Sequence, residues 1–286
     1  MNSIADTLRE ATRNISNTLA LDLTTSRIEV QCLLQHVLKV QRAYLLAHPE
    51  QTLSETQQRE FDTLLASRLL GEPIAHLLGE REFFGLNLKV TPATLIPRPD
   101  TELIVELALN RISQSQSCRV LDMGTGSGAI ALAIAKNKPN VVMVAVDASQ
   151  AALVVACENA HRLGIANVSF LQSDWFSTLG GQCFDLIVSN PPYIAAGDIH
   201  LSQGDLRFEP LSALASGVDG LDDIRRIIGE APHHLSSNGV LLLEHGYDQA
   251  ESVRDLLKQR GFVEVFSEKD IAGIERVSGG CLNKPI

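Results

Sequence analysis

The chain lacks paired cysteines, long apolar runs and an excess of basic charge. Its five cysteines are scattered and form no CxxC pair, which argues against a disulfide framework or a zinc site. The same pattern predicts that the protein resides in the reducing cytosol. Every apolar run is shorter than ten residues, so no segment is expected to span a bilayer. The first residues lack a basic stretch followed by an apolar one, so no signal peptide is expected and the predicted location is cytoplasmic.

Basic charge is scarce throughout. The net charge is −10; residues 1–80 carry 7 Lys and Arg against 10 Asp and Glu, and residues 81–286 carry 17 against 24. Non-specific binding to a nucleic acid backbone needs a dense Lys/Arg patch, and the sequence has none, although dispersed residues could still gather on one folded face. Direct nucleic acid partners are therefore not expected.

Three segments with different patterns divide the chain. A composition of 45% hydrophobic and 20% charged residues is typical of a globular protein, and 286 residues allow one large and one small domain. Residues 1–80 carry apolar residues at helical spacing, which predicts a small helical bundle that binds a partner or covers a site. Residues 81–100 alternate at period two and then contain three prolines, which predicts a hairpin linker. Residues 101–286 form the third segment.

Several helix starts can be predicted from capping residues. Ser54, with a glutamine three residues later, is a capping-box pattern. Thr25 or Ser26 is expected to be the N-cap of an earlier helix. Asp100 or Thr101 is expected to cap the first helix of the third segment.

From residue 118 onward, predicted strands and helices alternate. Seven strands with crossover helices predict a doubly wound α/β sheet, in which the last two strands, joined without a helix, pair antiparallel at one edge. Ligands bind such a sheet beyond the carboxyl ends of its strands, at the switch point. The predicted strands are 119–123, 141–146, 168–171, 184–188, 239–243, 263–267 and 274–277.

A glycine-rich loop, Gly124-Thr125-Gly126-Ser127-Gly128, follows the first predicted strand and opens a helix. The glycines allow a tight turn and a close approach to a ligand. The GxGxG spacing differs from the GxGxxG dinucleotide fingerprint, and no Lys follows as in a P-loop. A nucleotide-like ligand is expected here; the alternative is a tight turn that binds nothing.

Acidic residues end the next two predicted strands. Asp147 stands 19 residues after Gly128, where a carboxylate can accept both ribose hydroxyls of an adenosine. The alternative is an N-cap for the helix that starts near Ser149, and both roles can coexist. Asp174 and Trp175 can hold an adenine, the carboxylate through the exocyclic amine and the ring by packing. The alternative for Trp175 is an edge aromatic that covers the core.

The tetrapeptide Asn190-Pro191-Pro192-Tyr193 is the most specific feature and ends the strand predicted at 184–188. The prolines have fixed φ and stiffen the turn. The Asn190 side-chain oxygen and the Pro191 carbonyl can both accept hydrogen bonds from one planar NH₂ group, while Tyr193 packs over its face. In a doubly wound order Asn190 faces the 124–128 loop. The sequence thus predicts a site for an amine conjugated to a carbonyl or an aromatic ring.

Other polar positions carry weaker signals. Glu244-His245 ends the strand predicted at 239–243, where a structural hydrogen bond is expected rather than acid–base work. No His, Asp or Glu set has metal-ligand spacing, so no metal site is expected.

In this order, the 124–128 loop, Asp147 and the 190–193 tetrapeptide resemble a class I S-adenosylmethionine-dependent methyltransferase that acts on nitrogen. Five further segments resemble the release-factor glutamine methyltransferase (PrmC/HemK) family. The resemblance covers the whole chain and is specific from residue 79 onward; Met123 stands where Leu is commoner, which is a volume-conserving change. The five segments are 79–85, 95–102, 172–176, 207–210 and 242–246.

The resemblance implies a fold, a reaction and a set of site residues. The fold is a seven-stranded, Rossmann-like class I methyltransferase domain over 101–286, beside the helical domain and the hairpin linker. The reaction transfers a methyl group from S-adenosylmethionine to the side-chain amide nitrogen (N5) of the glutamine in the Gly-Gly-Gln motif of class I peptide chain release factors. S-adenosylhomocysteine is the product, and translation termination is the process that is modulated.

The implied roles are distributed over the motifs. The catalytic residues are Asn190, Pro191 and Tyr193, and together with Pro192 they bind the substrate glutamine. The cofactor is expected on Gly124, Thr125, Gly126, Ser127, Gly128, Asp147, Asp174, Trp175 and Asn190.

Two other functions compete with this one. An adenine-N6 methyltransferase on DNA or RNA also acts on a conjugated NH₂, but it needs base flipping and a basic groove, which the acidic charge balance disfavours. An NAD-dependent oxidoreductase, or a dinucleotide-binding module, is disfavoured by the glycine spacing and the 190–193 tetrapeptide.

Overall fold

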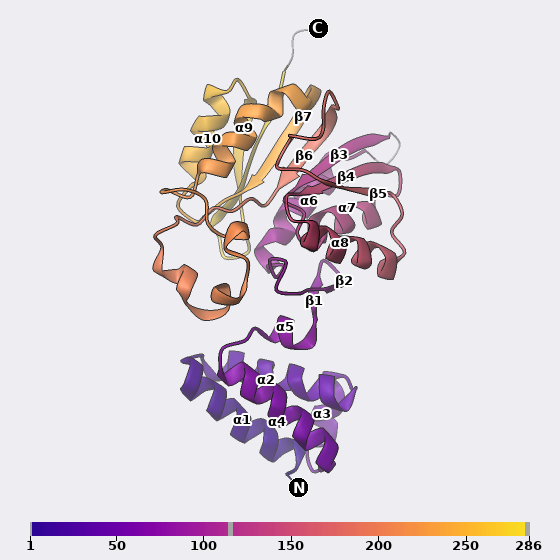
Figure 1. The fold of residues 1–286 in the computed structure, drawn as a ribbon, viewed down its shortest axis with the longest axis vertical. Helices are drawn as coiled ribbons and strands as arrows, with labels where there is room; N and C mark the ends of the chain where they lie inside the picture. Colours follow the sequence, from indigo (N-terminus) through magenta and orange to yellow (C-terminus); the bar gives the residue numbers. More distant parts are fainter. Residues whose placement is uncertain (1, 114–116, 284–286) are drawn as a thin grey trace. The chain divides into compact units, whose positions relative to one another are not determined.

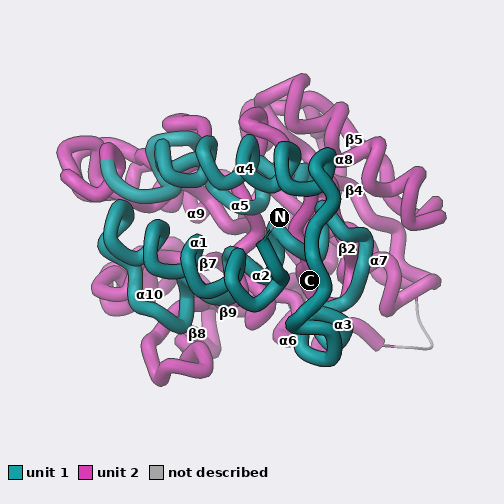
Figure 2. Tube along the Cα trace, turned by 90° about the horizontal axis from the view of Figure 1, so that it is seen from below, with its two compact units in different colours: residues 1–79, 203–208 teal, residues 80–202, 209–286 magenta. Residues whose placement is uncertain are grey.

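The computed structural model describes residues 2–113 and 117–283, which form two compact units (Figure 2). Unit 1 comprises residues 1–79 and 203–208, and unit 2 comprises residues 80–202 and 209–286. The predicted domains also contain residues 1, 114–116 and 284–286, which lie outside the described residues.

Unit 1 is a helical bundle (Figure 1). The apolar residues predicted at helical spacing form its core, in which Ile15, Leu33, Leu34 and Phe61 are fully buried. Burying such a side chain contributes about 1.5–3 kcal/mol, which is how amphipathic helices of modest propensity become stable. The helices are α1 (Ile4–Leu19), α2 (Leu23–Leu38), α3 (Arg42–Ala47), α4 (Glu55–Leu69) and α5 (Ile74–Leu78).

One of the two helix caps predicted in this unit is confirmed and the other is wrong. Ser54 caps α4 with the predicted capping box. Helix α2, however, begins earlier than expected, because Asp22 is its N-cap and accepts hydrogen bonds from the backbone N–H groups of Thr24 and Thr25 at 2.8 and 2.9 Å. An ionised carboxylate accepts such bonds more strongly than a hydroxyl, so the cap lies one turn before Ser26.

Unit 2 begins with a β-hairpin and a helix. Strands β1 (Glu80–Phe83) and β2 (Leu86–Lys89) pair antiparallel through a two-residue turn in which Phe84 and Gly85 both have positive φ. A short 3₁₀ turn, η1 (Pro99–Thr101), then leads into α6 (Glu102–Arg111). Thr101 occupies the predicted N-cap position, but its side chain makes no capping hydrogen bond.

A seven-stranded sheet with the order β5-β4-β3-β6-β7-β9-β8 organises the rest of unit 2. The last two strands pair antiparallel at one edge as predicted, with β9 inserted between β7 and β8. The described strands are β3 (Cys118–Met123), β4 (Val141–Asp147), β5 (Val168–Gln172), β6 (Phe184–Ser189), β7 (Leu235–Glu244), β8 (Val263–Lys269) and β9 (Glu275–Leu282).

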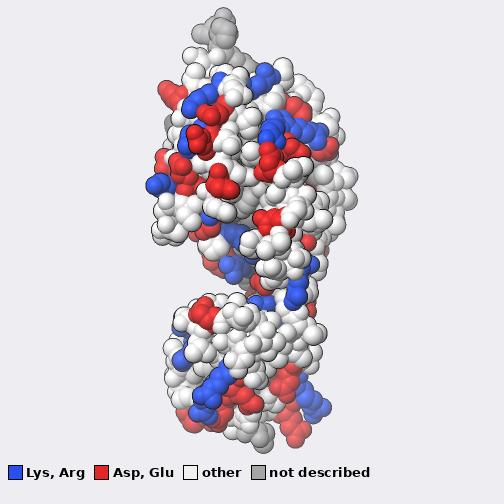
Figure 3. Space-filling view, turned by 90° about the vertical axis from the view of Figure 1, so that its left-hand side faces the viewer, with Lys and Arg blue, Asp and Glu red and all other residues white. Residues whose placement is uncertain are grey.

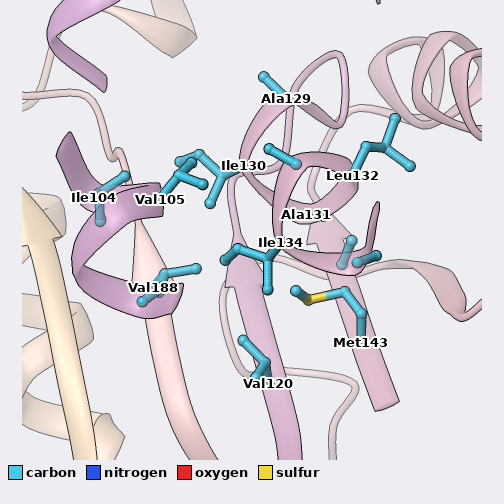
Figure 4. Packing of buried hydrophobic residues seen from close by; sticks show 14 of the residues in the cluster. Ile104, Val105, Val120, Ala129, Ile130, Ala131, Leu132, Ile134, Met143 and Val188 are labelled. Carbon is cyan, nitrogen blue, oxygen red and sulfur yellow. The ribbon is translucent and has the colours of Figure 1, made fainter. Parts of the chain in front are cut away.

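Helices pack on both faces of this sheet, so its central strands are nearly continuous apolar runs. On one face, Figure 4 shows Ile130 and Ile134 of α7 near Val105 of α6 and Val120 of β3. The other face packs against α9 and α10. The remaining helices of unit 2 are α7 (Ala129–Asn137), α8 (Gln150–Leu163), α9 (Asp222–His234) and α10 (Ala250–Gln259), with 3₁₀ turns η2 (Ile199–Ser202) and η4 (Leu211–Ala213). The 3₁₀ turn η3 (Gly204–Phe208) belongs to unit 1.

Candidate active site

The register of the parallel strands sets the chemically important residues side by side. Met123 pairs with Val146 on one side and with Ser189 on the other, and Ser189 pairs with Leu243. The residues that follow these positions, Gly124, Asp147, Asn190 and Glu244, therefore form one row at the carboxyl edge of the sheet. The row spans the switch point between β3 and β6, where doubly wound sheets bind ligands.

The 124–128 loop is held from behind by its own polar residues. Gly124, Gly126 and Gly128 all have positive φ, a conformation that other residues rarely adopt. Thr125 is buried and donates its hydroxyl to Asp122 at 2.6 Å, and the carbonyl of buried Ser127 accepts a hydrogen bond from Asn159 of α8 at 2.9 Å. The loop is thus fixed before a ligand binds.

Asp122 is a buried acid beneath this loop. Its Oδ2 accepts hydrogen bonds from Thr125 and from the backbone N–H of Ala131 at 3.2 Å, whereas Oδ1 has no partner among the described residues. Burial raises the pKa of Asp122 to about 7. The Asp122 carboxyl therefore changes its protonation state near neutral pH, and its hydrogen bond from Thr125 connects it to the loop.

Asp147 is held by two backbone donors. Its Oδ2 accepts from the N–H of Gly126 at 2.9 Å and its Oδ1 from the N–H of Ser149 at 2.8 Å. The alternative prediction that Asp147 caps the next helix is wrong, because Ser149 is the N-cap of α8. Burial raises the pKa of Asp147, and each carboxylate oxygen keeps acceptor capacity toward the cavity that it lines.

Trp175 and Asp174 both line the cavity but have other partners as well. The Trp175 indole N–H donates to Asp223 at 3.1 Å, and its ring lies 3.6 Å from the position a Cβ would take at Gly124. Both oxygens of the Asp174 carboxylate accept from one guanidinium nitrogen, Nη1, of Arg226 at 2.8 and 2.9 Å. Trp175 therefore forms a rigid aromatic wall, while Asp174 meets a ligand as a neutralised carboxylate.

The 190–193 tetrapeptide is fixed by residues from three other elements. The Asn190 side-chain N–H donates to the Thr101 hydroxyl at 3.1 Å, and the Tyr193 hydroxyl donates to Glu244 at 3.3 Å. The side chain of Gln249 donates to the Tyr193 carbonyl at 3.0 Å. Burial raises the pKa of Tyr193 and raises the pKa of Glu244 to about 7. Tyr193 is thus a neutral phenol at any ordinary pH.

Glu209 joins two of the segments that carry the family resemblance. Its buried carboxylate accepts from the backbone N–H of Ile96 at 3.0 Å and pairs with Arg98. The ion pair connects the 95–102 segment to the segment that returns to the sheet after the tetrapeptide. Both segments line the cavity, through Leu95 and Pro210 among others.

These parts surround a cavity of about 240 Å³ in unit 2. Three carboxylates line it, and no Lys or Arg of the described chain does. A cavity of this charge suits a ligand with a positive centre and disfavours one with two phosphates. The lining residues include Gly124, Gly126, Asp147, Asp174, Trp175, Asn190, Pro192 and Asp223.

The structure does not bring every predicted site residue to this cavity. In the described part of the chain, the lining lacks Thr125, Ser127 and Gly128, which support the loop from behind. It also lacks Pro191, which is buried, and Tyr193, whose ring packs against the core cluster behind the site. Direct ligand contact by these five residues stays a prediction.

Sequence reasoning missed four residues that shape the site: Thr101, Asp122, Asp223 and Glu209. Thr101 was expected only as a helix cap, and Glu209 was noted only as part of a similar segment. No spacing signal in the sequence distinguishes Asp223 from an ordinary acid in the first turn of a helix. Glu244 has the structural hydrogen bond that was expected.

Two family models match the chain. A methyltransferase domain matches residues 114–275, and the PrmC N-terminal domain matches residues 10–79. Among the described residues, no group of three or more His, Cys, Asp or Glu side chains is placed to hold a metal ion. In the same residues, no helix has the length and apolar character needed to cross a membrane.

Relatives named release factor glutamine methyltransferase match over nearly the whole chain. The one from Bordetella pertussis is 52% identical over 265 residues, which cover 92% of this chain and 98% of the relative. The one from Escherichia coli is 50% identical over 254 residues, covering 89% and 91%. The one from Coxiella burnetii is 47% identical over 270 residues, covering 94% and 97%.

Solved structures share the fold at low identity. A methyltransferase from Pyrococcus furiosus matches with a TM-score of 0.54 at 20% identity, covering 78% of this chain and all of that one. A Thermus thermophilus 16S rRNA N2 G1207 methyltransferase in complex with AdoMet and guanosine matches with a TM-score of 0.55 at 19% identity, covering 71% and 50%. The predicted fold class is confirmed.

Proposed function

The chain belongs to the release factor glutamine methyltransferase family, and we propose that it methylates the side-chain amide nitrogen of the Gly-Gly-Gln glutamine in class I release factors. The methyl donor is S-adenosylmethionine. One observation carries the proposal: Asn190 lines the cavity beside the glycine loop, with its side-chain N–H committed to Thr101. The side-chain oxygen is therefore the atom left to accept a substrate N–H.

The residues of the cavity fit the cofactor. Gly124 and Gly126 leave the loop without side chains on the cavity wall, and Asp147 offers carboxylate oxygens to a ribose diol. The Trp175 ring provides an apolar face for an adenine, and an acidic lining in which the charge of Asp147 is uncompensated suits a sulfonium and an ammonium group. When bound, the cofactor supplies an electrophilic methyl group.

The residues of the tetrapeptide compensate for the low reactivity of the glutamine amide nitrogen. An amide nitrogen reacts poorly because its lone pair is delocalised into the carbonyl. We propose that Asn190 Oδ1 and the Pro191 carbonyl accept both hydrogens of the glutamine NH₂, which pushes electron density onto nitrogen and aims it. Positioning of this kind supplies about 7–11 kcal/mol of the barrier at best. After transfer the nitrogen is strongly acidic and loses its extra proton without a dedicated base.

Nucleic acid substrates are disfavoured by the same observations. An adenine-N6 methyltransferase needs a basic groove for the backbone. Figure 3 shows Lys and Arg interspersed with Asp and Glu on the displayed face. The acidic cavity also disfavours a dinucleotide with its two phosphates.

We further propose that the helical unit 1 binds the body of the release factor. The Gly-Gly-Gln loop is a small part of a large substrate, and a second contact raises the effective concentration of that loop at the cavity.

We also propose that the enzyme works in the cytoplasm. Release factors act on cytoplasmic ribosomes, so enzyme and substrate share a compartment.

Mass spectrometry of a release factor incubated with the enzyme and S-adenosylmethionine tests the function. We expect one added methyl on the loop glutamine. Asn190→Ala should lower kcat by about 100-fold or more, because the NH₂ loses an aiming acceptor. The affinity for S-adenosylhomocysteine, measured by calorimetry, should stay within a few-fold. Methylation of DNA or ribosomal RNA but not of the factor would refute the proposal.

A further inference from the structure

We infer that Gln249 is a positioning residue that holds the 190–193 tetrapeptide in the place from which it binds the substrate glutamine. The inference rests on the proposed function, because it concerns the residues proposed to accept the glutamine NH₂. Gln249 is 8% exposed, stands at the start of α10 and does not line the cavity in the described part of the chain. Its side chain therefore acts on the substrate only through the tetrapeptide.

The side-chain amide of Gln249 joins three separate segments of unit 2. Its Oε1 accepts a hydrogen bond from the backbone N–H of Gly246, just beyond β7, at 2.8 Å. Its Nε2 donates to the carbonyl of Tyr193 at 3.0 Å and to the carbonyl of Asp219, just before α9, at 3.2 Å. The end of the tetrapeptide, the approach to α9 and the exit from β7 thus meet at one side chain.

Donor and acceptor rules permit only one orientation of this amide. The Oε1 of Gln249 meets an N–H group, and the two hydrogens of its Nε2 meet two carbonyls. A turned amide would set its oxygen against two carbonyl oxygens and its NH₂ against an N–H group. Because the side chain is buried, a lost partner is not replaced by water. The amide therefore fixes where the Tyr193 carbonyl lies.

The exit from β7, to which Gln249 is attached, is itself anchored. His245 is fully buried, and its Nδ1 lies 2.9 Å from the Gly246 carbonyl oxygen, which can only accept, so Nδ1 carries a proton. Burial lowers the pKa of His245, so the imidazole is neutral. Its Nε2 then accepts from the Ser278 hydroxyl of β9 at 2.8 Å. Gln249 therefore holds the tetrapeptide to a fixed point of the sheet.

Gly220 closes the other side of the Tyr193 carbonyl. Its φ is +76°, and a Cβ at this position would lie 2.1 Å from the Tyr193 oxygen. That separation is far shorter than a van der Waals contact, so a side chain here would push the carbonyl away. The proposed acceptors, Asn190 and Pro191, come just before Tyr193 in the chain. A shift of Tyr193 reaches them because the two prolines have fixed φ.

The cofactor side of the cavity is held by other bonds. The backbone N–H of Asp223 donates to the Ser216 hydroxyl at 2.8 Å, and the Asp223 carboxylate accepts from the Trp175 indole at 3.1 Å. Neither bond involves Gln249. Loss of the Gln249 amide should therefore lower kcat and leave the affinity for S-adenosylhomocysteine within a few-fold of the wild-type value. A role confined to stability would instead lower both in proportion to the folded fraction.

Substitutions in the full-length enzyme test the inference, with release factor methylation measured well below each unfolding midpoint. Gln249→Met keeps a similar shape and removes the hydrogen bonds, and kcat should fall by about 10- to 100-fold, since a misplacement of about 1 Å can cost about 100-fold. Gln249→Glu keeps the acceptor for Gly246, but its carboxylate cannot donate to Tyr193, so its kcat should fall as well. Gln259→Glu, at the exposed end of the same helix, is the matched control and should leave kcat unchanged.

Gly220→Ala provides the second readout, because it displaces the same carbonyl from the other side. Its kcat should also fall, and the double variant with Gln249→Met should lose less than the product of the two single losses. Calorimetry with S-adenosylhomocysteine and the fluorescence of Trp175, which is the only tryptophan in the sequence, should show that the cofactor side is intact in each variant.

A Gln249→Met enzyme with wild-type kcat would overturn the inference. A loss of kcat matched by an equal loss of S-adenosylhomocysteine affinity would overturn it too, as would fully multiplicative losses in the double variant. Inactivity of the wild-type enzyme on release factors would instead count against the proposed function.

Discussion

At the scale of single residues, Asp147 and Asp174 are two carboxylates that line one cavity but have different hydrogen-bond and ion-pair partners. Within the described residues, Asp147 accepts hydrogen bonds only from backbone N–H groups, which leave its charge uncompensated. Asp174 is paired with Arg226, and its side chain is 61% exposed. The first can therefore act strongly on a ligand, whereas water and a guanidinium screen the second.

This difference predicts unequal effects of two matched substitutions. Asp147→Asn should weaken S-adenosylhomocysteine binding by about 10- to 100-fold, because it removes charge-assisted hydrogen bonds worth about 1.5–3 kcal/mol. Asp174→Asn should weaken the same binding by less than about fivefold. Isothermal titration calorimetry measures both. A larger loss for Asp174→Asn would contradict the assignment of the ribose to Asp147.

At the scale of elements, helix α4 is tied to distant segments of unit 1 by one buried arginine. Arg68 is 4% exposed and donates to both carboxylate oxygens of Glu29 in α2 at 2.9 Å. It also pairs with Asp205 at 3.1 Å, and Arg207 donates to the Leu70 carbonyl at 2.7 Å. The 203–208 segment, which the chain reaches soon after the tetrapeptide, is thereby fastened to the bundle.

Removing that arginine should destabilise the unit. Arg68→Met leaves Glu29 nearly buried and unpaired, which should lower the free energy of unfolding by about 3–5 kcal/mol. Arg59→Met, on the same helix, removes only an exposed pair with Glu55 and should cost about 0–1 kcal/mol. Urea denaturation followed by circular dichroism measures both values. Equal costs for the two variants would show that Arg68 does not hold the bundle together.

At the scale of the whole molecule, the two units divide the proposed work. Unit 2 contains the cavity, and unit 1 is proposed to dock the release factor. Unit 1 has a hollow of about 380 Å³ between α1 and α4, lined by Glu10, Asp62 and other residues. The hydroxyl of Thr7 and the Oε1 of Gln58, both of which line this hollow, are buried without hydrogen-bond partners in the described chain.

Charge reversal in this hollow tests the docking role. Asp62→Lys should weaken binding to a full-length release factor by about tenfold, because it removes a carboxylate acceptor from the hollow and replaces it with a charge of the opposite sign. Turnover of a short Gly-Gly-Gln peptide, which reaches only the cavity, should not change. Glu60→Lys makes the same charge change on the same helix outside the hollow and serves as the control. Equal losses with factor and peptide would argue against docking by unit 1.

Much of the fold was predictable because local patterns carry it. Alternating apolar strands and amphipathic helices predict the doubly wound sheet, and the capping box at Ser54 predicts where α4 begins. The cap of α2 was misjudged because several adjacent polar residues there can each act as an N-cap. Only the backbone conformation identifies Asp22 as the residue that does so. The association of residues 203–208 with the helical unit has no local signal at all.

By itself, the sequence determined the types of chemical group at each strand end: a glycine loop, an acid, and an asparagine before two prolines. Those are local properties, written in consecutive residues. Tertiary structure alone decided which of these groups became neighbours, because strand register, not sequence distance, sets Gly124, Asp147, Asn190 and Glu244 in one row. It also decided how Asn190 faces the cavity, since its partner Thr101 stands 89 residues away in the chain. A hydrogen bond of that span exists only after the sheet has assembled.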